Sequence, residues 1–296
     1  MARLKPDPIS VEHLTRFLDD HSDFSFEIRV LNELVGLGFT CEHGGSYEDP
    51  VTKKPREFDI RARRDFGKRI LRLAVECKNV RENYPLLVSC VPRRDEEAFH
   101  EIAFSVNPDK ASLRKPERFS VPAMEPRSKA VRIRGDQSFY RSGDPVGKSC
   151  DQVGLTERGD IAASDSDVYA KWSQALSSAH DLTYEACRDG EERTGDVCLS
   201  LVFPLLVVPD GRLWVVEFDA EGNRACEPRQ TDRCSYFVNL SYYHNTMLSG
   251  DEMTLSHLEF LTVAGLHEFV GQLCGSDDRL ADSFPVEDVL SVLRLE

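Results

Sequence analysis

Hydrophobic and polar residues alternate between residues 70 and 78, with the period of a β-strand that buries one face. The apolar positions of this stretch are Leu71, Leu73, Val75 and Cys77. Glu76 and Lys78 fall together on the opposite face. The pattern therefore predicts a strand with a hydrophobic core on one side and an acid and an ammonium group on the other.

Residues 56–64 have the same period and place Asp59 on their polar face. The intervening residues 65–68 contain the glycine that short hairpin loops favour. A loop centred within these four residues would place Asp59 directly opposite Glu76. The two stretches are thus predicted to form one β-hairpin.

The predicted pair of Asp59 and Glu76 needs a positive partner, because like charges directly opposite each other in a sheet repel. A divalent cation between the carboxylates would turn this repulsion into binding, since hard cations take oxygen ligands. Alternatively, Lys78 and neighbouring arginines neutralise the two acids, and the group is structural. Strands disfavour Asp, Glu and Lys, so the convergence of all three favours a functional site.

Two helices are predicted before the hairpin, over residues 11–18 and from about residue 23 to residue 36. Asp23 or Ser25 can cap the second helix. Glu27 lies on or near the apolar stripe of this helix. An acid in a first turn complements the helix dipole, but the hairpin downstream favours a functional role for Glu27.

The rest of the chain adds further elements. Residues 168–187 form a predicted helix, with Lys171, Gln174 and Ser178 along a face that adjoins its apolar stripe. The other predicted elements are a strand over 39–47, an irregular and partly basic insertion over about 80–160, a hairpin formed by 199–208 and 213–218, a strand over 235–242, and amphipathic helices over 254–274 and 285–295.

Charge is distributed unevenly along the chain. The 296 residues include 37 Lys or Arg and 51 Asp or Glu, which gives a formal net charge of −14. Residues 51–81 nevertheless hold eleven Lys or Arg against four Asp or Glu, and residues 110–134 hold eight against two. Local basic patches decide where phosphates bind, so nucleic acid is a candidate partner. The alternative is that basic strands neutralise acidic helices.

Several classes of protein are disfavoured. The nine cysteines include no Cys-x-x-Cys pair, which argues against a structural zinc site. The glycines of residues 143–149 lack the spacing of a nucleotide phosphate loop. The longest apolar run, residues 199–209, is too short to span a bilayer, and the first residues lack a signal-peptide core. We therefore expect a cytoplasmic protein without a membrane partner.

The order of these features resembles the PD-(D/E)XK nuclease superfamily, which has the restriction-endonuclease-like fold. The shared order is a helix with Glu27, a strand, a hairpin with Asp59 and then Val75-Glu76-Cys77-Lys78-Asn79, a helix and a buried strand. The Mrr-type and Holliday-junction-resolvase-like nucleases are the most similar branch. The resemblance covers residues 23–79 well and residues 168–210 loosely; one departure is Phe58, where the family pattern has proline before the aspartate.

The resemblance implies an α/β protein with a central mixed β-sheet flanked by helices. Residues 1–22 would form a lead-in helix and residues 23–220 a nuclease-like core with the long irregular insertion at about 80–160. Residues 221–296 would add a strand and extra C-terminal helices packed on the core, in a single domain overall.

By the same resemblance, Asp59 and Glu76 would bind Mg²⁺, with the backbone carbonyl of Cys77 as a third oxygen ligand. Mn²⁺ would substitute for Mg²⁺. Glu27 would bind a second ion or a water on the metal.

Four further residues receive roles from the resemblance. Lys78 would orient the attacking water and help to deprotonate it. Gln174 would position the phosphate or the water. Arg61 and Arg63, on the polar face shared with Asp59, would contact flanking phosphates.

The implied function is Mg²⁺-dependent hydrolysis of DNA in bacterial restriction, phage defence or repair. RNA hydrolysis shares this chemistry and is one alternative. The other is a nuclease-fold protein without catalysis, which binds nucleic acid or assembles with another protein. A homodimer would fit a nuclease, because cutting two strands takes two sites.

Overall fold

The computed structural model describes residues 7–20, 22–49, 51–106, 127–192, 198–243, 252–274 and 284. The helices are α1 (Val11–Asp20), α2 (Phe24–Gly36), α4 (Ser166–Glu192) and α5 (Val263–Cys274), with 3₁₀ turns η1 (Asp95–Glu97) and η3 (Gly135–Gln137). The strands are β1 (Thr40–Glu48), β2 (Pro55–Phe66), β3 (Arg69–Cys77), β4 (Leu86–Pro92), β5 (Phe99–Val106), β6 (Arg127–Arg134), β7 (Pro145–Leu155), β8 (Ile161–Ser164), β9 (Cys198–Val208), β10 (Leu213–Glu217), β11 (Arg229–Gln230), β12 (Arg233–Tyr243) and β13 (Glu252–Thr262).

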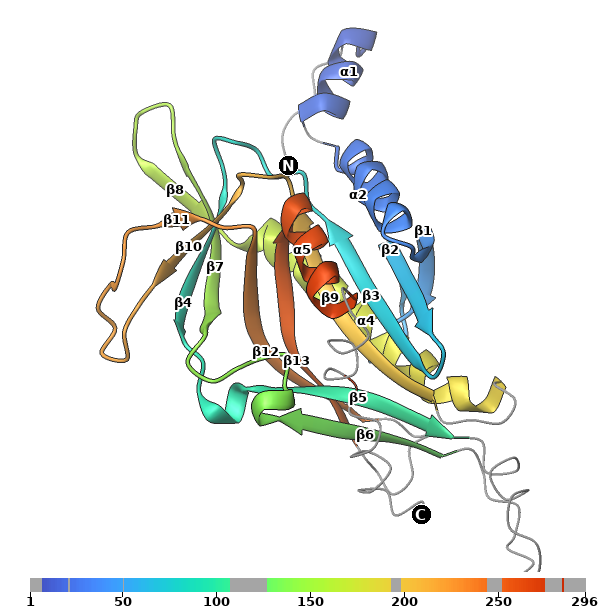
Figure 1. Cartoon of the computed structure of the whole chain (residues 1–296). Helices are drawn as coiled ribbons and strands as arrows, with labels where there is room; N and C mark the ends of the chain where they lie inside the picture. Colours follow the sequence, from blue (N-terminus) through green and yellow to red (C-terminus); the bar gives the residue numbers. More distant parts are fainter. Residues whose placement is uncertain are drawn as a thin grey trace, which may run out of the picture.

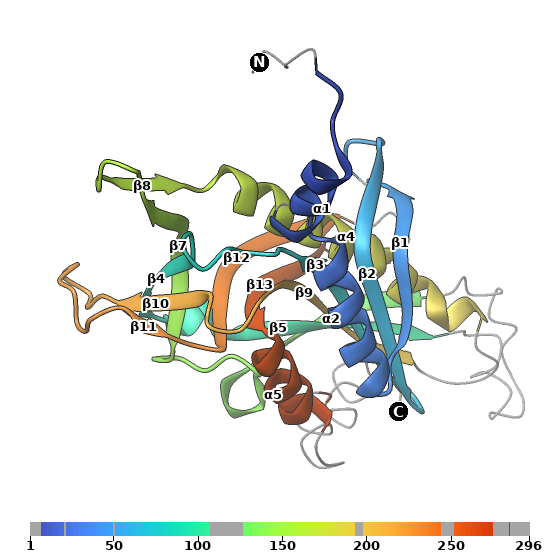
Figure 2. The same cartoon turned by 90° about the horizontal axis from the view of Figure 1, so that it is seen from above.

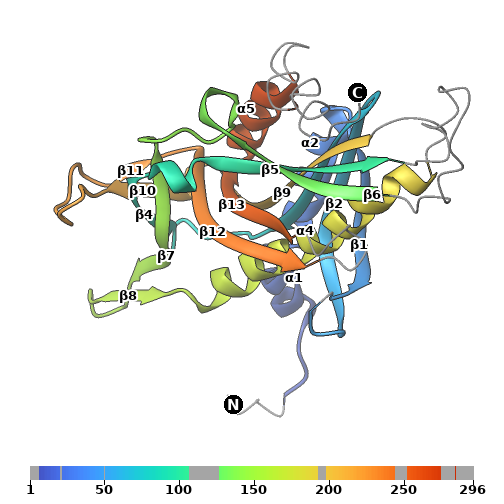
Figure 3. The same cartoon turned by 90° about the horizontal axis from the view of Figure 1, so that it is seen from below.

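All 13 strands belong to one mixed sheet (Figure 1). Its spatial order is β1-β2-β3-β9-β13-β12-β7-β4-β10-β11, and β8 pairs with β7. Strand β2 is antiparallel to both of its neighbours, β1 and β3, whereas β3, β9 and β13 run parallel. Strands β5 and β6 leave this path because β5 pairs with the start of β9, and they run across the other strands (Figure 3). The predicted α/β class with a mixed central sheet and flanking helices is confirmed.

Helices cover both faces of the sheet (Figure 2). Leu71, Leu73 and Val75 of β3 pack in the hydrophobic cluster that includes residues of α2 and α5. Ala74, which points the opposite way, packs in the cluster that includes α4. The predicted period of two along β3 therefore separates two hydrophobic layers.

Strands β9 and β13 lie in the middle of the sheet, and this position overturns two predictions. Residues 199–208 and 213–218 do not form a hairpin, because β9 lies between β3 and β13 while β10 pairs with β4 and β11. Residues 254–262 are a strand instead of the first half of a helix. Both strands are buried along almost their whole length. A continuous apolar run such as β9 does not distinguish a central strand from a helix, and in β13 the spacing of three between Leu255, Leu258 and Leu261 is compatible with a helix.

The insertion at about 80–160 is not irregular in its described part, where β4 to β7 account for most of the residues. Two of the prolines that suggested loops lie at strand ends. Pro92 closes β4 and faces Pro145, which opens β7, and strand ends tolerate proline. Residues 107–126, which hold the other prolines of the insertion except Pro85, lie outside the described residues.

The remaining predicted elements are found close to their expected bounds. Helices α1, α2 and α4 and strands β1 and β12 match the predictions, and the second half of the predicted helix 254–274 is α5. The helix predicted over 285–295 lies outside the described residues. None of the helices in the described ranges is long and apolar enough to span a membrane.

Candidate active site

The β2–β3 hairpin places Asp59 beside Glu76, as predicted. Its register pairs Ile60 with Val75 and closes at Phe66 and Arg69, so the next position outward brings the two acids together. The backbone N–H of Asp59 donates to Glu76 Oε1 at 3.3 Å, and the backbone N–H of Cys77 donates to Asp59 Oδ2 at 2.8 Å. The backbone itself therefore fixes the geometry of the carboxylate pair.

The positive charge between the two acids comes from α4. Lys171 Nζ lies 2.7 Å from Asp59 Oδ2 and 3.4 Å from Glu76 Oε2. Lys171 was not among the predicted site residues. The polar stripe of Lys171, Gln174 and Ser178 was the available signal, since all three side chains face β2.

Lys78 takes a different partner from the one predicted. Its Nζ lies 3.2 Å from Asp23 Oδ2, and no ion pair joins it to Asp59 or Glu76 within the described chain. Asp23 Oδ1 also accepts the backbone N–H of Asn79 at 2.8 Å. The Asp23 side chain thus joins the start of α2 to the end of β3 and makes no capping hydrogen bond to its own helix.

The two carboxylates of Asp59 and Glu76 share one ammonium group, that of Lys171. Glu76 is fully buried, and burial together with the charge of Asp59 raises its pKa to about 9, although Lys171 opposes this rise. Burial alone would lower the pKa of Lys171, but Asp59 and Glu76 outweigh it and raise that pKa above its ordinary value. Lys171 is therefore a cation at neutral pH, while Glu76 holds a proton until more positive charge arrives.

Glu27 lies close to this group without joining it. Its Oε2 is 3.5 Å from Nε2 of His43 on β1. Burial and the negative charge of Asp59 raise the pKa of Glu27, so the two carboxylates are near enough to repel. Among the described residues, no group of three or more His, Cys, Asp or Glu side chains is arranged to hold a metal ion. The structure thus brings together two of the three predicted acids.

Arg61 belongs to a different part of the β2–α4 interface. It is only 8% exposed, and its guanidinium lies 2.7 Å from Asp181 Oδ2 on α4. The aromatic rings of Tyr47 and Phe58 flank it at 4.7 and 4.4 Å. A phosphate contact by Arg61 would require these interactions to break, so its position is that of a structural residue.

The other two predicted residues are more accessible. Arg63 pairs with Asp65 two residues along the same strand, at 2.8 Å, which leaves it at the surface of the hairpin. Gln174 Nε2 donates to the backbone carbonyl of Glu57 at 2.6 Å. Gln174 therefore connects α4 to β2 beside the acids and has no described contact with them.

A pocket of about 410 Å³ opens next to the site. It shares Asp23 and Lys78 with the contacts described above, and Asn79 and Arg81 extend its lining along the chain that follows β3. Two cations therefore face solvent-accessible space beside the carboxylates. Comparison of the chain with protein families, with curated proteins and with solved structures finds no match.

Proposed function

We propose that this protein is a Mg²⁺-dependent nuclease of the PD-(D/E)XK superfamily that hydrolyses phosphodiester bonds in DNA. The observation that carries the proposal is the convergence of Asp59, Glu76 and Lys171 at the open end of the hairpin. The order α2, β1, β2–β3, α4 and β9 supports it, because this is the order of elements on which the resemblance to the superfamily rests.

The donor set fits a Mg²⁺ ion. Asp59 and Glu76 offer carboxylate oxygens, which hard cations prefer, and Mg²⁺ usually keeps several waters, so two protein carboxylates suffice. Burial, and then the charge of Asp59, raise the pKa of Glu76 even beside Lys171, so a bound cation would stabilise its carboxylate form. The ion would be held by these two side chains and the backbone carbonyl of Cys77, and it would stabilise negative charge on the phosphate.

Lys171 takes the role that the sequence suggested for Lys78. Its raised pKa keeps it protonated, so it serves as a hydrogen-bond donor and a positive charge instead of a base. With an ion on the carboxylates, the ammonium group of Lys171 would be available to donate to the phosphate or to the attacking water. Lys78 and Arg81, which line the adjoining pocket, bind the phosphates next to the scissile bond.

The ion pair between Lys171 and Asp59 favours a second candidate function. At 2.7 Å, this ammonium neutralises one acid without any metal, and Glu76 is neutral when protonated. A nuclease-fold protein that only binds nucleic acid, or assembles with another protein, would keep such a self-sufficient group.

Incubation with plasmid DNA, linear DNA and RNA, in Mg²⁺ or Mn²⁺ and in EDTA, separates the two functions. If the protein is a nuclease, we expect metal-dependent cleavage of DNA that is lost in Asp59→Asn. Cleavage should be retained in Asp160→Asn, a matched change on an exposed loop. Cleavage that persists in Asp59→Asn would refute the site. Absence of cleavage on every substrate, together with absence of Mg²⁺ binding by calorimetry, would refute the nuclease and favour the second function.

A further inference from the structure

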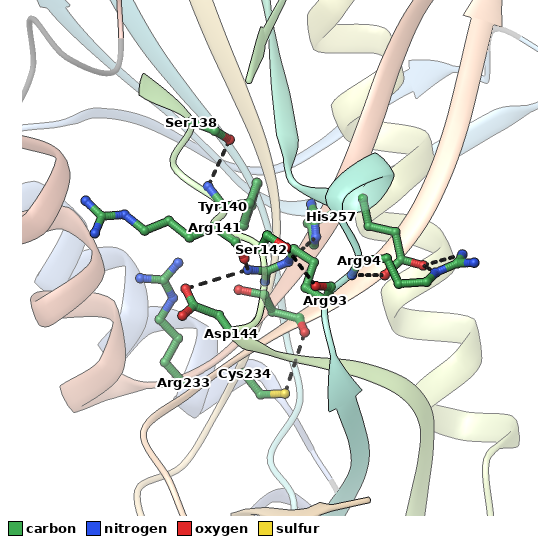
Figure 4. A network of polar contacts seen from close by, with 12 residues as sticks. Arg93, Arg94, Ser138, Tyr140, Arg141, Ser142, Asp144, Arg233, Cys234 and His257 are labelled. Atoms are coloured by element: carbon green, nitrogen blue, oxygen red, sulfur yellow. Dashed lines mark hydrogen bonds and ion pairs between the residues drawn. The ribbon is translucent and has the colours of Figure 1, made fainter. Parts of the chain in front are cut away.

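A second pocket, of about 510 Å³, lies among β4, β10, β12 and α5, and none of its lining residues belongs to the candidate active site. Four arginines contribute to its wall: Arg93, Arg141, Arg229 and Arg233. Figure 4 shows Arg93 at the centre of the polar network on this wall, with Asp144 and Arg233 beside it. We refer to this space as the arginine pocket.

Arg93 has a buried charge without a close buried counter-charge, because the buried Glu259 acts on it only from a distance and pairs directly with Arg233. It is 4% exposed, and its Nε and Nη1 donate to His257 Nε2 at 3.2 Å and to the backbone carbonyl of Arg141 at 2.9 Å. The only carboxylate paired with it among the described residues is Asp144, at 3.8 Å, and that side chain is 61% exposed. Burying a cation without a close anion is costly, and burial lowers the pKa of Arg93.

His257, the side chain that accepts a hydrogen bond from Arg93, is neutral and does not balance its charge. Burial and then the charge of Arg93 hold the pKa of His257 well below its usual value, so the imidazole is neutral. Its Nε2 accepts from Arg93, and its Nδ1 lies 3.0 Å from the hydroxyl of Ser256. Nδ1 therefore carries the proton, and the ring serves only to hold the guanidinium in place.

The other arginines of the pocket differ in their ion-pair partners. Arg233 pairs with Glu259 at 2.7 Å, and Arg229 pairs with Glu217 at 2.8 Å. Arg141 is exposed and has no ion pair with a described residue. The surplus of positive charge in the arginine pocket therefore resides on Arg93 and Arg141.

Tyr140 adds a buried donor to the same wall. It is 2% exposed and lines the pocket, yet its hydroxyl makes no hydrogen bond of normal geometry. The pKa of Tyr140 is well above its usual value, through burial and then the charge of Glu259, so the hydroxyl keeps its proton. The carboxylate of Glu259 also acts as a hydrogen-bond acceptor for this hydroxyl, so Tyr140 forms part of the pocket wall and is not assigned to the ligand.

We propose that the arginine pocket binds a phosphate group, held by Arg93 and Arg141. Guanidinium groups match the geometry of phosphate oxygens and bind them with charge-assisted hydrogen bonds. The volume of about 510 Å³ exceeds that of a phosphate and suits a nucleotide-sized ligand. The phosphate therefore belongs to a free nucleotide or to the end of a nucleic-acid strand. This proposal does not depend on the nuclease activity.

Calorimetric titration with inorganic phosphate and pyrophosphate, in low salt and EDTA, tests the site. We expect saturable binding that Arg141→Ala weakens at least about fivefold, since Arg141 has no structural ion pair to lose. Arg93→Lys, which keeps the charge but loses the planar fork, has a similar effect. Arg158→Ala, a change at an exposed arginine outside the pocket, leaves binding unchanged.

Two results would overturn the phosphate site. One is the absence of saturable binding up to about 10 mM of either anion. The other is binding that survives Arg141→Ala and Arg93→Lys but is lost in Arg81→Ala, which would place the phosphate in the pocket beside Lys78.

A comparison of ligands then identifies the source of the phosphate. A 5′-mononucleotide that binds more tightly than inorganic phosphate, and depends on Arg141, indicates a free nucleotide. An oligonucleotide whose binding depends on both its 5′-phosphate and Arg141, judged against the same strand with a 5′-hydroxyl, indicates a strand end. Nucleotide and oligonucleotide binding that is independent of Arg141 would contradict the proposal.

Discussion

Helix α4 meets the β2–β3 hairpin through two charge clusters of opposite arrangement. Near its beginning, the helix supplies a cation, Lys171, and the strands supply the acids Asp59 and Glu76. Further along, the helix supplies the acids and the strands supply the cations. The second cluster joins Arg61 and Arg72 of the strands with Asp181 and Glu185 of the helix. We call the first the carboxylate cluster and the second the arginine cluster, which is separate from the arginine pocket.

The two clusters differ in charge balance. In the arginine cluster two cations meet two acids, and aromatic rings flank Arg61. Burial raises the pKa of Glu185, but Arg72 and Arg61 oppose the rise. In the carboxylate cluster a single cation serves two acids, and the pKa of Glu76 reaches about 9. The complete burial of Glu76, together with the surplus of acid, distinguishes the candidate active site from its scaffold.

The largest expected effect concerns the cation of the carboxylate cluster. Lys171→Met should lower Mg²⁺-dependent DNA cleavage by about a thousandfold, because it removes a positive donor aimed at the phosphate. Lys78→Met should lower cleavage by less than about tenfold, because Lys78 contributes phosphate binding only. Plasmid nicking rates measure both, with circular dichroism as a control for folding. The reverse order of effects would restore Lys78 as the catalytic lysine.

The arginine cluster should respond in stability. Arg61→Met should lower the free energy of unfolding by about 2 kcal/mol, since it leaves Asp181 without its cation, whereas Glu185 keeps its pair with Arg72. Arg63→Met, at a surface pair with Asp65, should cost less than about 1 kcal/mol. Urea unfolding measures both values. Equal effects of the two changes would show that the arginine cluster is no more structural than the surface of the hairpin.

Glu76 should make the metal-free protein less stable as the pH rises. Its folded-state pKa of about 9 exceeds the ordinary value of 4.5, so the folded state retains a proton that the unfolded state releases. Stability from this proton is fully present below pH 4.5 and is lost as the pH rises toward 9. Glu76→Gln should therefore gain at least about 2 kcal/mol relative to the wild type between pH 5 and pH 8. Urea unfolding in EDTA measures the free energy of unfolding of both proteins across this pH range. A difference between Glu76→Gln and the wild type that does not change with pH would contradict the prediction.

Mg²⁺ should stabilise only the protein with an intact carboxylate cluster. At an ion concentration about tenfold above Kd, binding adds about 1.4 kcal/mol, which raises Tm by a few degrees. Asp59→Asn should abolish this shift, and Arg63→Met should leave it unchanged. An equal shift in all three proteins would place the ion elsewhere.

The sequence predicted the hairpin well because its determinants are local. The period of two and the glycine between the strands fix the register that places Asp59 beside Glu76. Lys171 could not be assigned in the same way, because its partner depends on how α4 is oriented over the whole sheet. For the same reason Lys78, adjacent in sequence to Glu76, was assigned to the carboxylates although Asp23 is its partner.

Predictions outside the hairpin were wrong where the local signal was ambiguous. Residues 254–262 are apolar enough for either a buried helix or a central strand, and only their position between β9 and β12 decides. Pro92 and Pro145 suggested loops, yet they face each other at the ends of paired strands. Long-range pairing, which single-sequence patterns do not encode, determined both outcomes.

The 112 residues that separate Lys171 from Asp59 have a consequence for protein synthesis. The hairpin and its two acids leave the ribosome first, while the helix that carries their cation and the strand β9 beside β3 are still to be made. Contacts of such high sequence separation form late in folding. A nascent or prematurely terminated chain therefore carries the acids without the lysine, and the candidate active site is completed only after α4 has been translated and packed on the hairpin.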